Sequence, residues 1–394
     1  MIKDRKYQID TEENKTFLQE NAEALLAFGH QFPSPQGGAY YLGDDGTTWK
    51  DRPRETWITC RMAHVYSLGT VLGHPGSREL AEAAVAGLRG ELQDREHGGW
   101  FVILAGCSAS LVGAAGAKEL LNDALAVYDE KFWDEEQGLA VDTWNTEFTE
   151  LDPYRGINAN MHTVEAFLAA ADTLGEDRYR VRAGRIIDHV VGWAGDNDYR
   201  IPEHFHEDWT PDLEKNRDKP DDPFKPYGAT PGHGIEWARL IVQWASSTYG
   251  VDSAEAVPYL ETAGKLYRRA VADAWNVDGA RGIVYTTDWQ GRPVVHDRMH
   301  WTLAEAINTS AVLYRVTGDA GYADDYSEFM EYLDEVVLDH NCGSWYHQLD
   351  EHNQLMTTVW PGKSDIYHAL QAMLIPYRPV DLSVGVYGTD REVR

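Results

Sequence analysis

An internal repeat is the feature of this sequence that most restricts its fold. Stretches with helical hydrophobic periodicity alternate with a recurring non-helical phrase, and no β-α-β alternation is visible. The phrase joins two short aromatic or β-branched stretches through a polar turn containing Asp, Asn or Gly, which is a β-hairpin pattern. It occurs six times, at Gly37–Trp49, His97–Trp100, Gln137–Phe148, Tyr199–Asp212, Gly282–Val294 and Gly343–Leu355.

Between these phrases the periodicity predicts about twelve helices. Six hairpins and twelve helices close most simply into an all-α (α/α)6 barrel, with apolar inner helices, shielding outer helices and the hairpins at one mouth. We expect one catalytic domain spanning residues 1–394. The expected helices are Glu12–Phe28, Arg54–Leu72, Ser77–Leu92, Val102–Gly113, Ala117–Phe132, Asn158–Leu174, Asp177–Trp193, Gly232–Tyr249, Ala254–Trp275, His300–Thr317, Gly321–Leu338 and Asp365–Leu374.

Two intervals depart from the repeat. The second phrase stops after Trp100, and about 20 residues of the period are missing there. Either this repeat has lost a hairpin and a helix start, or that segment is absent from the sequence. The polar, proline-rich stretch Asp212–Gly228 is an extra loop, which is a lid, a cleft wall or a plain surface insertion.

Composition limits the kinds of molecule that we expect this protein to bind. The formal net charge is −29, and no run of Lys or Arg could hold a polyphosphate or an anionic membrane, so we expect neither nucleic acid nor membrane as partner. The three cysteines form no C-x-x-C, which argues against a disulfide framework or a cysteine zinc site. With no signal-peptide pattern and no run of 18 apolar residues, we expect a cytoplasmic monomer or homodimer.

Histidines recur at the expected starts of the inner helices. In a sixfold barrel these starts ring one mouth, so residues far apart in sequence converge there. The partial positive charge at a helix start favours a neutral imidazole, which can accept a proton near pH 7. The motifs are NANMHTVEAF (His162, Glu165), PGHGIEWARL (His233, Glu236), DRMHWTLAEA (His300, Glu305) and KSDIYHALQA (His368).

Each of these features also has a structural interpretation. A single histidine at a helix start is often structural, and a His–Glu pair can be a local helix contact. Three histidines permit zinc, but no H-E-x-x-H motif is present, so we expect neither a metal nor another cofactor. The carboxylates expected at the mouth permit a glycosidase pair without singling one out; they are Asp142, Glu203, Asp208 and Asp288.

The aromatic residues and one arginine are compatible with a sugar-binding site. The chain has 14 Trp and 21 Tyr, which suit either a sugar cleft or a packed core. Trp57 and Arg61 lie four residues apart on one expected helix face. A buried Arg61 needs a polar or anionic partner, either a structural carboxylate or an oxyanion formed during a reaction.

Four motifs together resemble the N-acylglucosamine 2-epimerase superfamily, and within it most closely the aldose–ketose isomerase branch of mannose and sulfoquinovose isomerases. They are TWITCRMAHVY, YRGINANMHTVEAF, TPGHGIEWARL and WPGKSDIYHALQA. The resemblance implies an (α/α)6 barrel that works without a metal or redox cofactor. It places the proton-transferring histidines at His233 and His368, the arginine on the substrate oxygens at Arg61, an assisting glutamate at Glu236, and substrate-binding residues at Trp57, Asn158, His162, Trp301 and Glu305.

The resemblance implies interconversion of D-mannose and D-fructose, with D-lyxose and D-xylulose as a second pair, through a cis-enediol. We place His368 at C2 and His233 at C1 and ring opening, although the two roles can be exchanged, and expect Glu236 to orient His233. The alternatives are a sugar 2-epimerase, a sulfoquinovose isomerase, an (α/α)6 glycoside hydrolase and a non-catalytic sugar-binding protein. Relatives usually place another polar residue after the second hairpin, and this chain lacks it.

Overall fold

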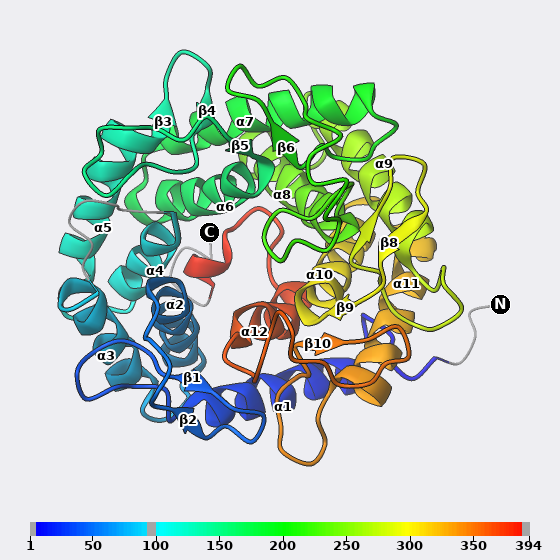
Figure 1. Ribbon diagram of the computed structural model, residues 1–394. Helices are drawn as coiled ribbons and strands as arrows, with labels where there is room; N and C mark the ends of the chain where they lie inside the picture. Colours follow the sequence, from blue (N-terminus) through cyan, green and yellow to red (C-terminus); the bar gives the residue numbers. More distant parts are fainter. Residues whose placement is uncertain (1–4, 93–99, 388–394) are drawn as a thin grey trace.

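The computed structural model describes residues 5–92 and 100–387, and twelve α-helices lie within them, arranged as two concentric rings (Figure 1). Alternate helices belong to alternate rings. The inner ring consists of α2 (Thr56–Leu72), α4 (Trp100–Leu111), α6 (Ile157–Leu174), α8 (Pro231–Tyr249), α10 (His300–Thr317) and α12 (Ile366–Leu374).

Each outer helix packs against an inner helix next to it in sequence, except that α1 packs against α12 and so joins the two ends of the chain. Each inner helix contacts the next, and α12 contacts α2, which closes the ring. This confirms the predicted (α/α)6 barrel. The outer ring consists of α1 (Glu12–Gly29), α3 (Ser77–Arg89), α5 (Ala117–Val127), α7 (Asp177–Asp196), α9 (Val257–Ala274) and α11 (Ala320–Tyr332).

Burial explains which helices lie inside. Every residue from His300 to Leu313 of α10 is buried, whereas α7 buries only a stripe that includes Tyr179, Ala183 and Val190. A helix surrounded by others has no solvent face, whereas an outer helix needs only one apolar stripe. Gly73 ends α2 with φ of 79°, a left-handed conformation that favours glycine.

Short non-α turns complete the barrel. The outer helices α5 and α11 each run on into a π turn, and two 3-10 turns follow α12. The last of these turns packs against α4 and α6. Their bounds are η1 (Tyr128–Phe132), η2 (Leu333–Val337), η3 (Ile375–Tyr377) and η4 (Val384–Val386).

All the named strands are two or three residues long and pair antiparallel, and two of the predicted hairpins need correction. The first phrase forms a simple hairpin, the fifth forms a hairpin with an irregular register, and the third pairs slightly earlier than expected. In the fourth and sixth phrases the first strand pairs instead with residues directly before α6 or α10. The pairs are β1 (Tyr41–Leu42) with β2 (Thr48–Trp49), β3 (Trp133–Asp134) with β4 (Leu139–Ala140), β5 (Arg155–Gly156) with β6 (His204–Phe205), β7 (Thr286–Thr287) with β8 (Pro293–Val295), and β9 (Arg298–Met299) with β10 (Gln348–Leu349).

The predicted turns of the fourth and sixth phrases nevertheless form. Isolated bridges join Phe205 to Pro211 and Leu349 to Leu355. Each of these two phrases therefore carries a hairpin, and the first strand of that hairpin also pairs with the residues directly before an inner helix. The second phrase, His97–Trp100, lies almost wholly outside the described residues; the apolar segment expected near Val102–Gly113 is helical as α4.

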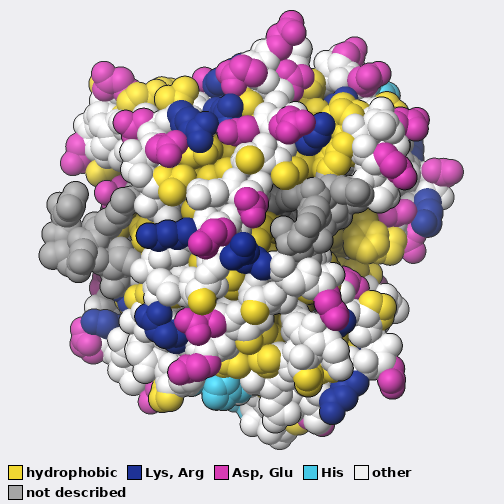
Figure 2. Space-filling view, turned by 90° about the vertical axis from the view of Figure 1, so that its left-hand side faces the viewer, with side chains coloured by type: hydrophobic (Ala, Val, Ile, Leu, Met, Phe, Trp, Pro, Cys, Tyr) yellow, Lys and Arg dark blue, Asp and Glu magenta, His cyan; other side chains and the backbone are white. Residues whose placement is uncertain are grey.

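The surface matches the acidic composition. On the face shown in Figure 2, Lys and Arg side chains lie singly or in small groups among Asp and Glu side chains. None of the described helices is both long enough and apolar enough to cross a membrane.

Candidate active site

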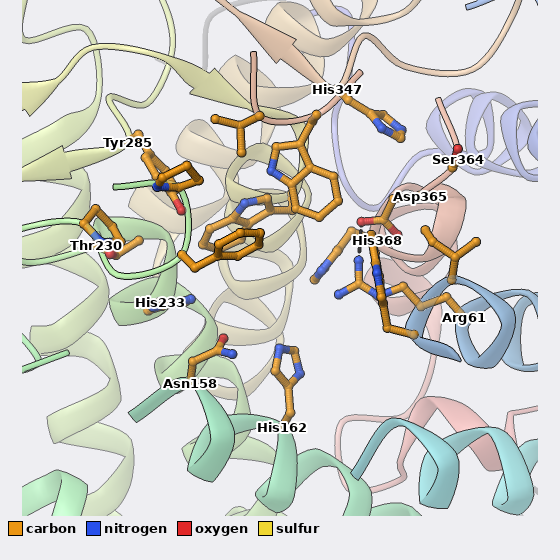
Figure 3. Close-up of a pocket in the computed structure, with 18 of the residues that line it drawn as sticks. Arg61, Asn158, His162, Thr230, His233, Tyr285, His347, Ser364, Asp365 and His368 are labelled. Carbon is orange, nitrogen blue, oxygen red and sulfur yellow. Dashed lines mark hydrogen bonds and ion pairs between the residues drawn. The ribbon is translucent and has the colours of Figure 1, made fainter. Parts of the chain in front are cut away.

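A cavity of about 480 Å³ opens where the inner helices begin, on the side of the strand pairs. Side chains from α2, α6, α8, α10 and α12 line it together with connecting loops (Figure 3). The structure therefore brings together residues spread over more than 300 positions. All but one of the predicted site residues lie on its wall: Trp57, Arg61, Asn158, His162, His233, Glu236, Trp301 and His368.

His233 is the third residue of α8 and is held by a glutamate from another element. Its Nδ1 lies 2.8 Å from Oε2 of Glu203, in the loop before β6. Glu236, expected to orient His233, is not its partner. The residue before His233 is Gly232, where a Cβ atom would lie 2.7 Å from the Trp301 ring. This glycine therefore lets the indole of Trp301 approach α8, with its ring centroid 5.1 Å from that of His233.

His368 is the third residue of α12 and has a different carboxylate behind it. Its Nδ1 lies 3.3 Å from Oε1 of Glu305, while Oε2 of the same glutamate accepts a 2.8 Å hydrogen bond from Nε of Arg239. Glu305 is fully buried and absent from the cavity wall, so it supports His368 instead of contacting a ligand there. Burial lowers the pKa of His368, which favours the neutral imidazole.

Trp301 connects the two histidines. Its ring centroid lies 5.1 Å from that of His233 and 6.1 Å from that of His368. Both imidazoles therefore flank one indole on the wall of one cavity. This is the arrangement needed for two proton-transferring groups to act on one small ligand.

His162 and Asn158 come from the first two turns of α6. Nδ1 of His162 lies 3.4 Å from Oε2 of Glu165, so this His–Glu pair is the local contact that its spacing allows. Gln371 of α12 donates to the other oxygen of Glu165 at 3.4 Å. Burial lowers the pKa of His162, whereas the side chain of Asn158 stays exposed to the cavity.

Glu236 lies in a group of buried carboxylates. Its Oε1 is 3.5 Å from Nη2 of Arg239, and an oxygen of Glu236 lies within 4.8 Å of ligand atoms of Glu165 and His162. Burial and the nearby charge of Glu305 raise the pKa of Glu236 well above its ordinary value. Several carboxylates share one buried guanidinium here, and this crowding of negative charge favours the protonated form of Glu236.

Arg61 has the carboxylate partner that its burial requires. Its Nη1 forms an ion pair with Oδ2 of Asp365, the residue before α12. The guanidinium lies between the rings of Trp57 and Tyr367, 5.1 and 5.0 Å from their centroids. Burial opposes ionisation of Asp365, but the charge of Arg61 together with the contacts to His300 and His368 outweighs it and lowers the pKa of Asp365.

His300 does not reach the cavity, which corrects the expectation that all four helix-start histidines converge there. It is the first residue of α10, lies behind the cavity wall and stacks on His347, with ring centroids 4.0 Å apart. Its Nε2 lies 3.4 Å from Oδ2 of Asp365. The first position of the helix therefore supports Asp365, while the third positions of α8 and α12 face the cavity.

Two contributors to the site were not predicted from the sequence, and a third was predicted only as one of several candidates. Asp365 stands in the KSDIYH motif but was not assigned a role, and His347 on the cavity wall was not considered. Glu203 was considered only as one of several mouth carboxylates. The extra loop proves to be a cleft wall, because Pro223, Phe224 and Pro226 line the cavity, and the side chain of Phe224 is 90% exposed.

The family model described as N-acylglucosamine 2-epimerase (GlcNAc 2-epimerase) matches residues 37–105 and 101–372. The chain belongs to this family. The two matched segments meet at residues 101–105, next to the point where the second repeat is short.

Two similar relatives are D-mannose isomerases. The chain is 39% identical over 393 residues to a D-mannose isomerase from Thermobifida fusca, covering 93% of this chain and 95% of the relative. It is 39% identical over 359 residues to a D-mannose isomerase from Pseudomonas cannabina pv. alisalensis, covering 86% and 87% respectively.

Solved structures agree on the fold. The crystal structure of a D-mannose isomerase superposes with a TM-score of 0.84 at 26% identity, over 92% of this chain and 97% of that one. The cellobiose 2-epimerase from Spirochaeta thermophila superposes with a TM-score of 0.77 at 18% identity, over 94% of this chain and 98% of that one. The second likeness shows a shared barrel alone.

Proposed function

We propose that this protein is an aldose–ketose isomerase that interconverts D-mannose and D-fructose, with D-lyxose and D-xylulose as a second pair. The observation that carries the proposal is that His233 and His368 flank one indole in a single cavity. The two D-mannose isomerase relatives, each 39% identical to this chain, favour the same sugar.

In the proposed mechanism, His233 assists ring opening by passing a proton between O1 and the ring oxygen. Neutral His368 then removes the proton from C2 while O1 takes up a proton, which gives a cis-enediol. The hydroxyl on O2 gives up its proton as His233 delivers one to C1, so C2 is oxidised and C1 is reduced within one molecule and no external oxidant is needed. Positioned acid–base groups of this kind each supply about 10²–10⁴ in rate.

The remaining residues of the cavity have distinct tasks in this mechanism. Arg61, held by Asp365, stabilises negative charge that develops on O1 and O2. His162 and Asn158 bind hydroxyls from the α6 side. Glu236 lies on the cavity wall and hydrogen-bonds the sugar, which differs from the orienting role expected from the sequence.

We further propose that no metal ion takes part. Among the described residues, His162, Glu165 and Glu236 form a group whose ligand atoms lie within 4.8 Å of one another. However, Arg239 lies 3.5 Å from Glu236, and the pKa of Glu236 is raised well above its ordinary value. A nearby guanidinium opposes binding of a cation, and so does a carboxyl group that is harder to deprotonate.

The geometry gives little support to a glycosidase. That chemistry needs an acid and a second carboxylate on opposite sides of the bond that breaks. Three carboxylates on the cavity wall are already engaged: Glu55 accepts from Tyr41 and Trp57, Glu203 binds His233, and Asp365 binds Arg61.

Incubation with D-mannose in buffer containing EDTA tests the proposal. We expect D-fructose to form at the same rate with and without the chelator. Formation of D-glucose without fructose would instead identify a 2-epimerase, which returns the proton to C2 from the other face. Saturable sugar binding without any product would identify a sugar-binding protein.

A further inference from the structure

Glu203 lies where the starts of two inner helices meet. The next residue, His204, pairs with Gly156, which caps α6. The backbone carbonyl of Glu203 accepts a 3.1 Å hydrogen bond from the amide of Ile157, the first residue of α6. Its Oε1 accepts one of 3.1 Å from the amide of Thr230, the N-cap of α8. One residue thus joins the two helices that carry His162 and His233.

The other side-chain oxygen of Glu203 faces the imidazole of His233. Oε2 lies 2.8 Å from Nδ1, and the carboxylate is 5% exposed. A carboxylate only accepts hydrogen bonds, so Nδ1 must carry the proton. Nε2 is then the nitrogen left to accept a proton, and His233 keeps 15% exposure on the cavity wall.

We propose that Glu203 is the positioning residue for His233. It holds the imidazole in the Nδ1–H tautomer and stabilises the positive charge that His233 gains when Nε2 takes a proton. The tautomer follows from the contact itself, whereas the effect on turnover rests on the proposed function. Glu203 is 30 positions from His233 in sequence, so helical spacing does not reveal the pairing.

Nuclear magnetic resonance of protein labelled with ¹⁵N-histidine tests the tautomer without using activity. The His233 signals are assigned by their loss in His233→Asn. We expect the wild type at pH 8 to show Nδ1 protonated and Nε2 unprotonated, and Glu203→Ala to show averaging between the two tautomers. A wild type protonated at Nε2, or unchanged signals in Glu203→Ala, would overturn the proposal.

Kinetics with D-mannose test the effect on turnover. Glu203→Gln keeps the shape of the side chain and an acceptor oxygen but loses the charge. We expect kcat to fall about 10- to 100-fold while KM stays within about threefold, because the loss concerns a charge that forms during the reaction. Exposed Glu207, four residues along, is the matched control, and Glu207→Gln should leave both constants unchanged.

The two measurements separate the two hypotheses. If wild-type protein makes no ketose, the proposed function fails, and the tautomer still decides whether Glu203 positions His233. If the wild type isomerises mannose but Glu203→Gln keeps kcat within about twofold, the proposed role in turnover is wrong. Circular dichroism and melting of the Gln variant distinguish loss of turnover from loss of folding.

Discussion

The two catalytic candidates face the same indole but have different surroundings. His233 is supported by Glu203, whose other oxygen meets only a neutral backbone amide at 3.1 Å. His368 is supported by Glu305, which also serves the guanidinium of Arg239 at 2.8 Å. A carboxylate shared with a cation stabilises an imidazolium less than one paired with an amide. The carboxylates behind two histidines at equivalent helix positions therefore differ in what else they bind.

Loss of either imidazole is the largest expected effect. His233→Ala and His368→Ala should each lower kcat for ketose formation about 10²- to 10⁴-fold, because each removes a proton-transferring group. His206→Ala, at an exposed position on the fourth phrase, is the control and should retain activity. Turnover of either cavity variant within about tenfold of the wild type would break the proposed division of proton transfer.

Arg61 tests the side of the cavity next to His368. Arg61→Lys keeps a positive charge but loses the planar group that binds Asp365 and lies between two aromatic rings. We expect kcat/KM for D-mannose to fall about 10²- to 10³-fold, the loss typical of a donor to a developing oxyanion. A variant as active as the wild type would show that any cation suffices there.

Substitution of the two supporting glutamates, Glu305 and Glu203, should change the free energy of unfolding by different amounts. Glu305→Gln removes the charge that faces buried Arg239, so the free energy of unfolding should fall by about 1.5–3 kcal/mol. Glu203→Gln should change it by less than about 1 kcal/mol, because the amide oxygen can still accept from Thr230 and the amide nitrogen can donate to Nδ1 of the other tautomer of His233. Chemical denaturation of both variants measures the difference, and equal losses would contradict the contrast.

The protonation of His368 can be measured directly. Because burial lowers its pKa, its imidazole should stay neutral as the pH falls through 6.5, the ordinary histidine value. Proton transfer by His368 should therefore persist at pH values where an exposed histidine is already charged. Titration followed by nuclear magnetic resonance, with His368→Asn for assignment, gives the midpoint; a value above 6.5 would contradict burial as the dominant effect.

Replacement of Glu236 by glutamine should have the smallest effect. Its pKa is raised well above the ordinary value, which favours the protonated form, and a glutamine amide resembles that form. We expect Glu236→Gln to keep kcat within about threefold at pH 7, whereas Glu236→Ala loses the hydrogen bond and activity. A large loss in the Gln variant would show that Glu236 acts as a carboxylate.

Much of the site could be predicted from the sequence because a repeated unit of two helices and a hairpin indicates a closed barrel. The recurring hairpins and periodic helices predicted the barrel, and the helix-start histidines predicted where a site would form. Trp57, Arg61, His162, His233 and His368 all lie on the cavity wall. A histidine in the first turn of an inner helix does not always face the cavity, because His300 lies behind the cavity wall and stacks on His347.

The partners of these side chains were decided by the tertiary structure. Helical spacing suggested that Glu236 would serve His233, and Glu305 was expected to bind substrate at the mouth of the barrel. In the folded chain Glu203 serves His233 and Glu305 serves His368. Hydrophobic periodicity determines which face of a helix turns inward, and so it determined the barrel. A hydrogen bond between distant segments depends on how neighbouring helices and strands are packed. Packing brings together residues whose separation in sequence follows no repeating pattern, so hydrophobic periodicity could not predict these pairs.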